Sequence, residues 1–165
     1  MAGEAPVPPR TVSLGGGIRV PYPIPSSASA SAKGRANRRS GSRAEQSVRS
    51  AVHRRGLRFR VDHAVQVGGL KVRPDLVFTK AKVAVFVDGC FWHRCPLHGT
   101  VPKSNTAYWL PKLERNVERD ARVTDALASS GWRVVRAWEH EDPIEVADEV
   151  ERLVRGRVRG VSSGR

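Results

Sequence analysis

The sequence VAVFVDGCFWHRCPLH occupies residues 83–98 and decides the fold. Its first five residues, 83–87, are all apolar, so both faces of an extended chain would be buried. Such a run is typical of a central strand that is covered on both sides. The polar and irregular residues 88–98 follow at once. The stretch therefore predicts a buried strand with chemically useful side chains at its carboxyl end.

Helix and strand signals surround this strand in a definite order. Ser42 and Glu45 form the capping-box pattern of a helix start, and Gly56 is a typical helix end. Pro111, a favourable first-turn residue, and Gly131 bound a second helix. The order of helix, three or more strands, helix, strand and helix predicts an α/β fold with a mixed central sheet flanked by helices. We expect helices over residues 42–56, 111–131 and 144–154, and strands over 57–61, 65–67, 70–72, 76–78, 83–87 and 132–138.

The charge of the chain is strongly basic and unevenly distributed. The 165 residues include 29 Lys and Arg against 16 Asp and Glu, for a formal net charge of +13. Residues 33–74 carry 12 basic and two acidic side chains, which is +10 of that total. Such a concentration fits a polyanionic partner, most simply nucleic acid. A highly solvated surface encoded by an Arg-rich genome is the alternative.

Several protein classes are excluded by composition. The apolar run 83–87 is too short to span a bilayer, so no membrane partner is expected. The beginning of the chain lacks the pattern of a secretory signal. Two cysteines do not make a disulfide framework and favour a reducing cytoplasm. We expect a flexible, basic-ended tail rich in Pro, Gly, Ser and Ala over residues 1–41, one domain over 42–156 and a flexible end over 157–165.

Cysteine and histidine residues cluster directly after the central strand. Cys90, Cys95 and His98 place three metal-ligand side chains within nine residues. A structural zinc site needs one more ligand. His140 is the best candidate for the fourth ligand, and His93 is its rival. Packed thiols with surface histidines, or a Cys90–Cys95 disulfide, are the alternatives.

Two carboxylates are expected to lie at the ends of neighbouring strands. Asp75 precedes the strand predicted at 76–78, and Asp88 ends the central strand. Mg²⁺ prefers one or two carboxylates together with water and phosphate oxygens. His93, five residues beyond Asp88, could serve as a general acid or base beside a metal-bound phosphate. A Pro-Asp pair alone can also simply begin a turn or strand.

Large aromatic side chains occupy the segments expected to be polar loops. Phe91, Trp92, Tyr108 and Trp109 lie in or near such segments, with basic residues close by. Aromatic rings in this setting suit stacking on bases or insertion between them. The alternative is that these rings are ordinary core residues.

Several blocks, in the same order along the chain, resemble the very short patch repair (Vsr) DNA mismatch endonucleases. The resemblance runs from about residue 33 to residue 140. It implies a restriction-endonuclease-like core with the order αβββαβ, which agrees with the order derived above. The blocks are Arg73-Pro74-Asp75, Phe86-Val87-Asp88-Gly89-Cys90-Phe91-Trp92-His93, Pro102-Lys103, Tyr108-Trp109, Asn116-Val117-Glu118-Arg119-Asp120 and Gly131-Trp132-Arg133-Val134 through Trp138-Glu139.

The resemblance also implies roles for individual residues. Asp75 would be the catalytic carboxylate that binds Mg²⁺, together with the main-chain carbonyl of Val87, and His93 the general acid or base. Glu45 matches an acidic residue near the metal, and Asp88 replaces a histidine of the best-known member, which suggests metal binding at that position. The structural zinc would be bound by Cys90, Cys95, His98 and His140. The DNA-binding residues would be Phe91, Trp92, Trp109, Lys103, Asn116, Arg38, Arg39 and Arg43.

The implied activity is Mg²⁺-dependent hydrolysis of a phosphodiester bond in DNA. The family nicks the thymine strand at T:G mismatches that arise when 5-methylcytosine is deaminated, and so begins very short patch repair. The expected partner is mismatched duplex DNA, bound by a monomer in a bacterial cytoplasm at the nucleoid. A functional link to a cytosine-5 DNA methyltransferase follows from the origin of the lesion. The alternatives are a restriction-type nuclease acting on matched DNA and a non-catalytic, zinc-stapled DNA-binding module.

Overall fold

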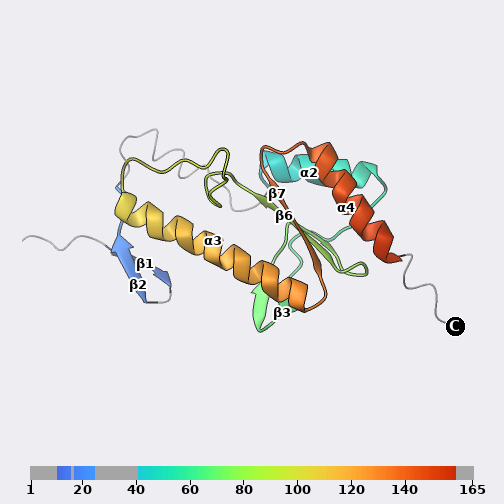
Figure 1. Ribbon diagram of the computed structural model, residues 1–165, viewed down its shortest axis with the longest axis horizontal. Helices are drawn as coiled ribbons and strands as arrows, with labels where there is room; N and C mark the ends of the chain where they lie inside the picture. The colour runs from blue at the N-terminus through green and yellow to red at the C-terminus, as the bar shows by residue number, and fades with distance from the viewer. Residues whose placement is uncertain (1–10, 16, 25–40, 159–165) are drawn as a thin grey trace, which may run out of the picture.

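The computed structural model describes residues 11–15, 17–24 and 41–158 as a mixed α/β chain (Figure 1). None of the helices in these ranges has the length and apolar character to cross a membrane. In chain order the elements are β1 (Thr11–Gly15), β2 (Ile18–Pro21), α2 (Arg43–Arg54), β3 (Val65–Val67), β4 (Leu70–Val72), β5 (Leu76–Phe78), β6 (Val83–Asp88), α3 (Thr106–Ser129), β7 (Arg133–Trp138) and α4 (Pro143–Val158).

A three-stranded sheet with the order β5-β6-β7 forms the centre of the molecule. Strands β5 and β6 are antiparallel, whereas β6 and β7 are parallel. The parallel pair is joined through α3, because two parallel strands need a long crossover connection. The sheet is therefore mixed, as the sequence predicts, and β6 is its central strand.

The two faces of the sheet are covered by different helices. Val83 and Val85 of β6 pack in one apolar cluster with residues of α2 and α4, while Ala84 packs in a second cluster with Leu127 of α3. Alternate residues of a strand point to opposite faces, which explains why an unbroken apolar run was needed here. Figure 1 shows α2 and α4 side by side, with α3 away from them. The strand β6 thus lies between α2 and α4 on one face of the sheet and α3 on the other.

Helix α2 begins as the capping-box pattern predicts, with one difference. Ser42 is the N-cap, and its Oγ accepts a hydrogen bond from the Glu45 backbone N at 3.1 Å. The Glu45 carboxylate accepts from the backbone N of Gly41 at 2.7 Å, one residue before the expected partner. The cap therefore fixes Glu45 as a buried acidic residue of the first turn.

Helix α3 begins earlier than predicted. Its first residue is Thr106, so Pro111 lies inside the helix instead of in its first turn. Proline within a helix removes one backbone hydrogen bond, and α3 continues for 24 residues across it. Tyr108 and Trp109 are consequently helical, where the sequence suggested a loop.

Two further expectations differ from the structure. Residues 57–61 form no strand and make a single bridge, between Arg60 and Val77, while Leu57 is buried in the core. Within the expected tail 1–41, β1 and β2 form an antiparallel hairpin. Val20 of β2 is buried, and the side-chain amide of Asn105 donates to Ile24 O at 2.8 Å. This contact with the start of α3 was not visible in composition. Residues 1–10, 16, 25–40 and 159–165 lie outside the described residues.

Candidate active site and metal centre

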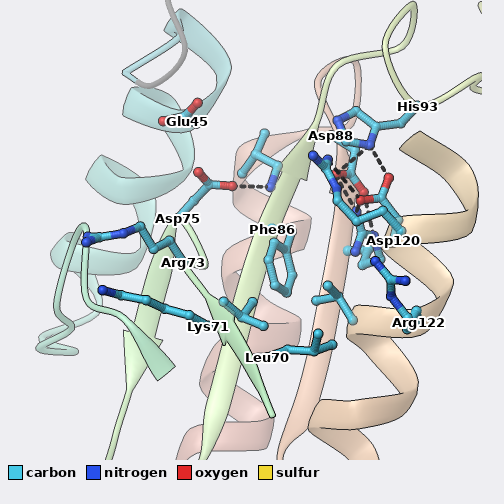
Figure 2. A pocket seen from close by; sticks show the side chains of 15 residues that line it. Glu45, Leu70, Lys71, Arg73, Asp75, Phe86, Asp88, His93, Asp120 and Arg122 are labelled. Carbon is cyan, nitrogen blue, oxygen red and sulfur yellow. Dashed lines mark hydrogen bonds and ion pairs between the residues drawn. The ribbon is translucent and has the colours of Figure 1, made fainter. Parts of the chain in front are cut away.

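A pocket of about 440 Å³ is lined by β4 and the residues that follow it, the end of β6, α3 and β7, and by one residue of α2. Figure 2 shows its walls, with Glu45 and Asp75 on one side and Asp88, His93 and Asp120 on the other. Four of these five residues were candidates in the sequence, and Asp120 was not. The two sides differ in their hydrogen bonding and charge.

Asp75 is a carboxylate with little compensation for its charge. Its Oδ2 accepts a hydrogen bond from the backbone N of Val87 at 2.7 Å. Burial raises the pKa of Asp75 from 3.8 to about 6, against the Val87 hydrogen bond, and the negative charge of Glu45 contributes to the rise. A nearby cation would favour the ionised form, so this side of the pocket suits a metal ion.

Glu45 lies beside Asp75 on the first turn of α2 (Figure 2). Its Oε2 forms a 3.2 Å ion pair with Arg49 of the next turn, in addition to accepting from Gly41. Arg49 also approaches the backbone O of Asp75 at 3.5 Å. Glu45 thus has both a structural role as a cap and a position beside Asp75.

Asp88 has a different environment from Asp75. Arg136 of β7 donates from Nε to Asp88 Oδ2 at 2.7 Å and from Nη2 to Oδ1 at 2.8 Å. A bidentate Arg–carboxylate pair neutralises the charge and fixes the orientation of both groups. The carboxylate of Asp88 is therefore already occupied by a protein cation.

His93 completes this second side of the pocket. Its Nδ1 is hydrogen-bonded to Asp120 Oδ2 and lies 3.5 Å from Asp88 Oδ1. Burial alone would raise the pKa of Asp120, but His93 and Arg136 outweigh it, and the pKa lies below its ordinary value. Asp120 belongs to the block 116–120 singled out in the sequence, yet only the fold brings it to His93.

Basic side chains surround the mouth of the pocket. Lys71 and Arg73 come from β4 and the residues after it, and Arg119 and Arg122 come from α3. Figure 2 shows Lys71 and Arg73 opposite Arg122. Cations on both sides of a carboxylate pocket suit a phosphodiester backbone that crosses it.

A second cluster of candidate ligands lies beside this pocket. One ligand atom from each of Cys90, Cys95, His98 and His140 lies within 4.8 Å of the others. Cys90 Sγ is 3.1 Å from His140 Nδ1, and Cys95 Sγ is 4.0 Å from His98 Nδ1. Tetrahedral zinc, with ligands at about 2.0–2.3 Å, separates its ligand atoms by about 3.5 Å. The donor set and spacing suit one zinc ion.

The structure bears on the alternatives for these cysteines. Both are free and buried, so they form no disulfide. Burial and the neighbouring Cys95 raise the pKa of Cys90 to about 11. A metal ion would instead bind the thiolate. His93, the rival fourth ligand, lies in the Asp88–Asp120 network, and His140 occupies the place beside the thiols.

The loop that carries the cysteines is tightly built. The backbone N of Cys90 donates to Glu139 Oε1 at 2.7 Å. A Cβ on Gly99 would lie 2.5 Å from Cys95 O, so no other residue fits there without a shift of the backbone. The loop therefore links the end of β6 to the end of β7 and holds His93 between them.

The predicted aromatic residues form one cluster at the start of α3. The ring centroids of Phe91 and Trp92 are 5.1 Å apart, and those of Phe91 and Trp109 are 5.4 Å apart. Lys112 Nζ lies 5.5 Å from the Trp92 ring and donates to Tyr108 Oη at 2.6 Å. The rings of Phe91, Trp92 and Trp109 are half-buried, so parts of them face solvent.

The remaining DNA-binding candidates have different positions. Lys103 and Arg43 are exposed, whereas Arg38 and Arg39 lie outside the described residues. Asn116 donates from Nδ2 to the backbone O of Trp92 at 3.0 Å. Asn116 thus fixes the backbone of Trp92 within the aromatic cluster. Lys112 and Arg136 were not candidates in the sequence. The partner of Arg136, Asp88, lies on another strand, whereas Lys112 contacts Tyr108 of its own helix.

Comparison with known proteins gives consistent matches. The sequence model described as DNA mismatch endonuclease Vsr matches residues 25–97. The type II nicking enzyme V.NaeI of Lentzea aerocolonigenes is 53% identical over 134 residues, which cover 81% of this chain and 79% of that protein.

More distant relatives carry similar names. The type II nicking enzyme V.XorIIP of Xanthomonas oryzae pv. oryzae is 44% identical over 106 residues, covering 63% of this chain and 74% of the relative. The DNA mismatch endonuclease Vsr of Escherichia coli K12 is 41% identical over 97 residues, covering 58% and 59%. The residues 25–97 matched by the family model include the end of β6 and the pocket residues before it.

Proposed function

The chain belongs to the Vsr family of DNA mismatch endonucleases, and we propose that it nicks the thymine strand of T:G mismatches by Mg²⁺-dependent hydrolysis. Membership makes it a DNA endonuclease, and the relatives named as nicking enzymes support cleavage of one strand. The strand, the mismatch and the metal are the proposed parts. The single observation that carries the metal-dependent hydrolysis is the undercompensated carboxylate of Asp75 in a pocket that also contains His93. The strand and the mismatch are proposed from the resemblance to the family.

The chemistry of the Asp75 side suits magnesium. Asp75 and Glu45 supply carboxylate oxygens, and Val87 supplies a backbone carbonyl next to the N–H that orients Asp75. Hard oxygen ligands of this kind are what Mg²⁺ prefers. A bound Mg²⁺ would polarise the scissile phosphate and stabilise negative charge on the leaving oxygen. Asp75 and Val87 would bind and orient, and Glu45 would add negative charge to the site.

His93 is proposed as the proton-transfer group. Its Nδ1 is engaged by Asp120, so Nε2 is the ring nitrogen available to a substrate or a water. Metal-assisted hydrolysis needs a proton removed from the attacking water or given to the leaving oxygen. His93 would move that proton at Nε2, with Asp120 orienting the ring.

Zinc is proposed as a structural ion. Cys90, Cys95, His98 and His140 would bind it, since their ligand atoms lie close enough together for one ion. The ion would fix the loop between β6 and α3. That loop carries His93 together with Phe91 and Trp92, two of the aromatic residues proposed to insert into DNA. Zinc would therefore act on catalysis only by fixing the positions of these side chains.

Mismatch recognition is proposed to come from the aromatic cluster. Phe91, Trp92 and Trp109 expose parts of their rings beside the pocket loop. Insertion of such rings unstacks a duplex, which costs least where pairing is already poor. The basic residues at the mouth would bind the backbone without reading sequence. The protein would act as a monomer, alongside a cytosine-5 DNA methyltransferase that produces the base from which the lesion arises.

The test uses four short duplexes that differ at one base pair. Each contains T:G, T:A, C:G or T:T at the same position and is labelled on either strand. The protein is incubated with each in Mg²⁺ or in EDTA, beside the variant Asp75→Ala. We expect one nick, on the thymine strand of the T:G duplex, only with Mg²⁺ and not with the variant.

Other outcomes would decide for the alternatives. Cleavage of both strands of the matched duplexes would favour a restriction-type nuclease. Tight binding of DNA with no cleavage under any condition would favour a zinc-stapled binding module. Nicking that persists in EDTA would contradict the role of Mg²⁺.

A further inference from the structure

Arg136 is a half-buried cation whose contacts converge on both acidic partners of His93. Besides the bidentate pair with Asp88, its Nη2 lies 3.2 Å from Asp120 Oδ1. We propose that Arg136 is a positioning residue that aligns Asp88 and Asp120 around His93 and so fixes the tautomer of its ring. The inference rests on the proposed function in taking His93 as the proton-transfer group.

The charges of this cluster explain why a cation is needed. Asp88 is 6% exposed, and both Asp88 and Asp120 approach the same nitrogen of His93. Two carboxylates facing one nitrogen repel each other unless a cation lies between them. Arg136 is that cation for both, while Arg119 contacts only Asp120 at 3.4 Å with an exposed side chain. A guanidinium fork suits this task because it can bind two carboxylates in one plane.

The fork also sets the chemistry of the histidine. Ionised carboxylates only accept hydrogen bonds, so the Nδ1 that faces Asp88 and Asp120 must carry a proton. Nε2 is then left free to exchange a proton with the substrate. If Asp88 or Asp120 turned away, the ring could rotate or change tautomer, and Nε2 would lose its alignment.

The fold holds Arg136 rigidly enough for this role. It stands beside Phe86 in the parallel register of β6 and β7, and its Cζ lies 4.8 Å from the Phe86 ring centroid. Its Nη1 is buried and has no hydrogen-bond partner among the described residues. A buried donor without a partner costs free energy, so this guanidinium is better explained by the carboxylates it aligns than by packing.

The test compares three variants of the full chain. Arg136→Met removes the charge but keeps a long side chain, and Arg136→Lys keeps the charge but not the fork. Arg55→Met is the matched control: Arg55 is similarly enclosed and pairs with Asp148 and Glu151, away from the pocket. The kcat and KM for nicking a T:G duplex are measured, together with the ring ¹⁵N shifts of His93 in the free protein.

We expect a wild-type His93 protonated at Nδ1 and an altered tautomer or a mixture in Arg136→Met. Loss of a group that orients a catalytic residue reduces activity by about 10–100-fold. That loss should fall in kcat, with KM changed by less than about threefold, and Arg136→Lys should recover part of it. Arg55→Met should lower thermal stability and leave both the tautomer and kcat as in the wild type.

The proposal is overturned if His93 keeps the wild-type tautomer and kcat in folded Arg136→Met. It is also overturned if Arg55→Met causes the same loss of kcat, since the effect would then follow stability. If Arg136→Met does not fold, the same shifts measured in Arg136→Lys decide. A wild-type protein that nicks no duplex would contradict the proposed function, and the tautomer would still test the positioning.

Discussion

The two sides of the pocket hold carboxylates in opposite electrostatic states. Asp75 accepts one backbone hydrogen bond and lies beside Glu45, and its pKa is raised to about 6 by burial. Asp120 is paired with His93, Arg136 and Arg119, and its pKa is lowered. The same residue type, within one pocket, is thus left undercompensated on one side and fully paired on the other.

This difference separates two chemical roles. The pKa of Asp75 is raised although Arg49 lies nearby, and a buried carboxylate in that state favours the binding of an external cation, whereas one paired directly with protein cations has less need of it. Asp75 is therefore the better candidate for a metal ligand, and the Asp88–Asp120 side is better suited to hold a histidine. The sequence suggested metal binding at Asp88 as well, and Asp88 does lie with His93 and Asp120 in a group whose ligand atoms are close enough for one ion. Its pairing with Arg136, which the sequence did not reveal, competes with that role.

The largest effect is expected from removing the charge of Asp75. Asp75→Asn keeps the shape of the side chain but removes the ionised oxygens, so Mg²⁺ binding and nicking should both be lost. Loss of a residue of this kind typically lowers kcat by about 10³-fold or more. Single-turnover nicking and Mg²⁺ titration calorimetry measure the two quantities. Asp88→Asn should lose nicking by a smaller factor and still bind Mg²⁺, and the reverse result would break the comparison.

Removal of the proposed zinc should disturb the side of the pocket that holds His93, Asp88 and Asp120 and leave the Asp75 side unchanged. Cys95→Ser should reduce the zinc content from one ion per chain to none and loosen the loop that carries His93. We expect nicking to fall by about 10²-fold, while Mg²⁺ binding at Asp75 is retained. Metal analysis by mass spectrometry measures the zinc. The exposed His53, outside the cluster, provides the control His53→Ala, and folded wild-type protein without zinc would refute the assignment.

Asp120 should contribute less than either metal-binding group. Asp120→Asn keeps a hydrogen-bonding side chain but lets the amide donate to His93 Nδ1, which favours the wrong tautomer. We expect kcat to fall by about 30-fold with KM nearly unchanged. Steady-state kinetics measure both values. An unchanged kcat would mean that Asp88 alone is enough to orient His93.

The sequence predicted the elements whose signals are local. The apolar run of β6, the Ser42 cap and the ligand spacing after Asp88 each lie within a few residues, and the structure contains the strand, the helix and the cluster. The start of α3 was predicted late because Pro111 is favoured in a first turn and is only tolerated inside a helix. The β1–β2 hairpin was missed because a Pro- and Gly-rich composition indicated no core of its own.

The residues missed in the pocket share one property. Arg136 lies 48 residues from Asp88 in the sequence, and Asp120 lies 27 residues from His93. Their partners are set by the parallel register of β6 with β7 and by the packing of α3, which no local pattern records. Asp120 did fall within a block that resembles the family, but the resemblance gave it no role. From the sequence alone, Arg136 on β7 and Asp120 on α3 look like solvent-exposed polar residues. Their pairing becomes visible only when both elements are packed against the end of β6.

The smallest expected effect concerns stability and the raised pKa of Asp75. The pKa of the Asp75 carboxyl group is 3.8 in the unfolded chain and about 6 in the folded protein, so the folded state binds this proton more tightly. Ionised Asp75 therefore costs folding free energy, and this cost grows between about pH 4 and pH 6 and stays constant above. Asp75→Asn should relieve it, by about 1–2 kcal/mol at pH 8 after allowance for partial exposure.

Urea unfolding of wild type and Asp75→Asn in EDTA at pH 4.5, 6 and 8 measures this difference. The free energy of unfolding of Asp75→Asn should not exceed that of the wild type at pH 4.5, and its excess over the wild type should be largest at pH 8. Asp125→Asn, which removes an exposed carboxylate of α3, controls for net charge. Added Mg²⁺ should stabilise only the wild type, because a ligand that binds the folded state shifts the equilibrium toward it. A gain that is equal at all three pH values would mean that Asp75 is compensated after all, and the contrast between the two sides of the pocket would disappear.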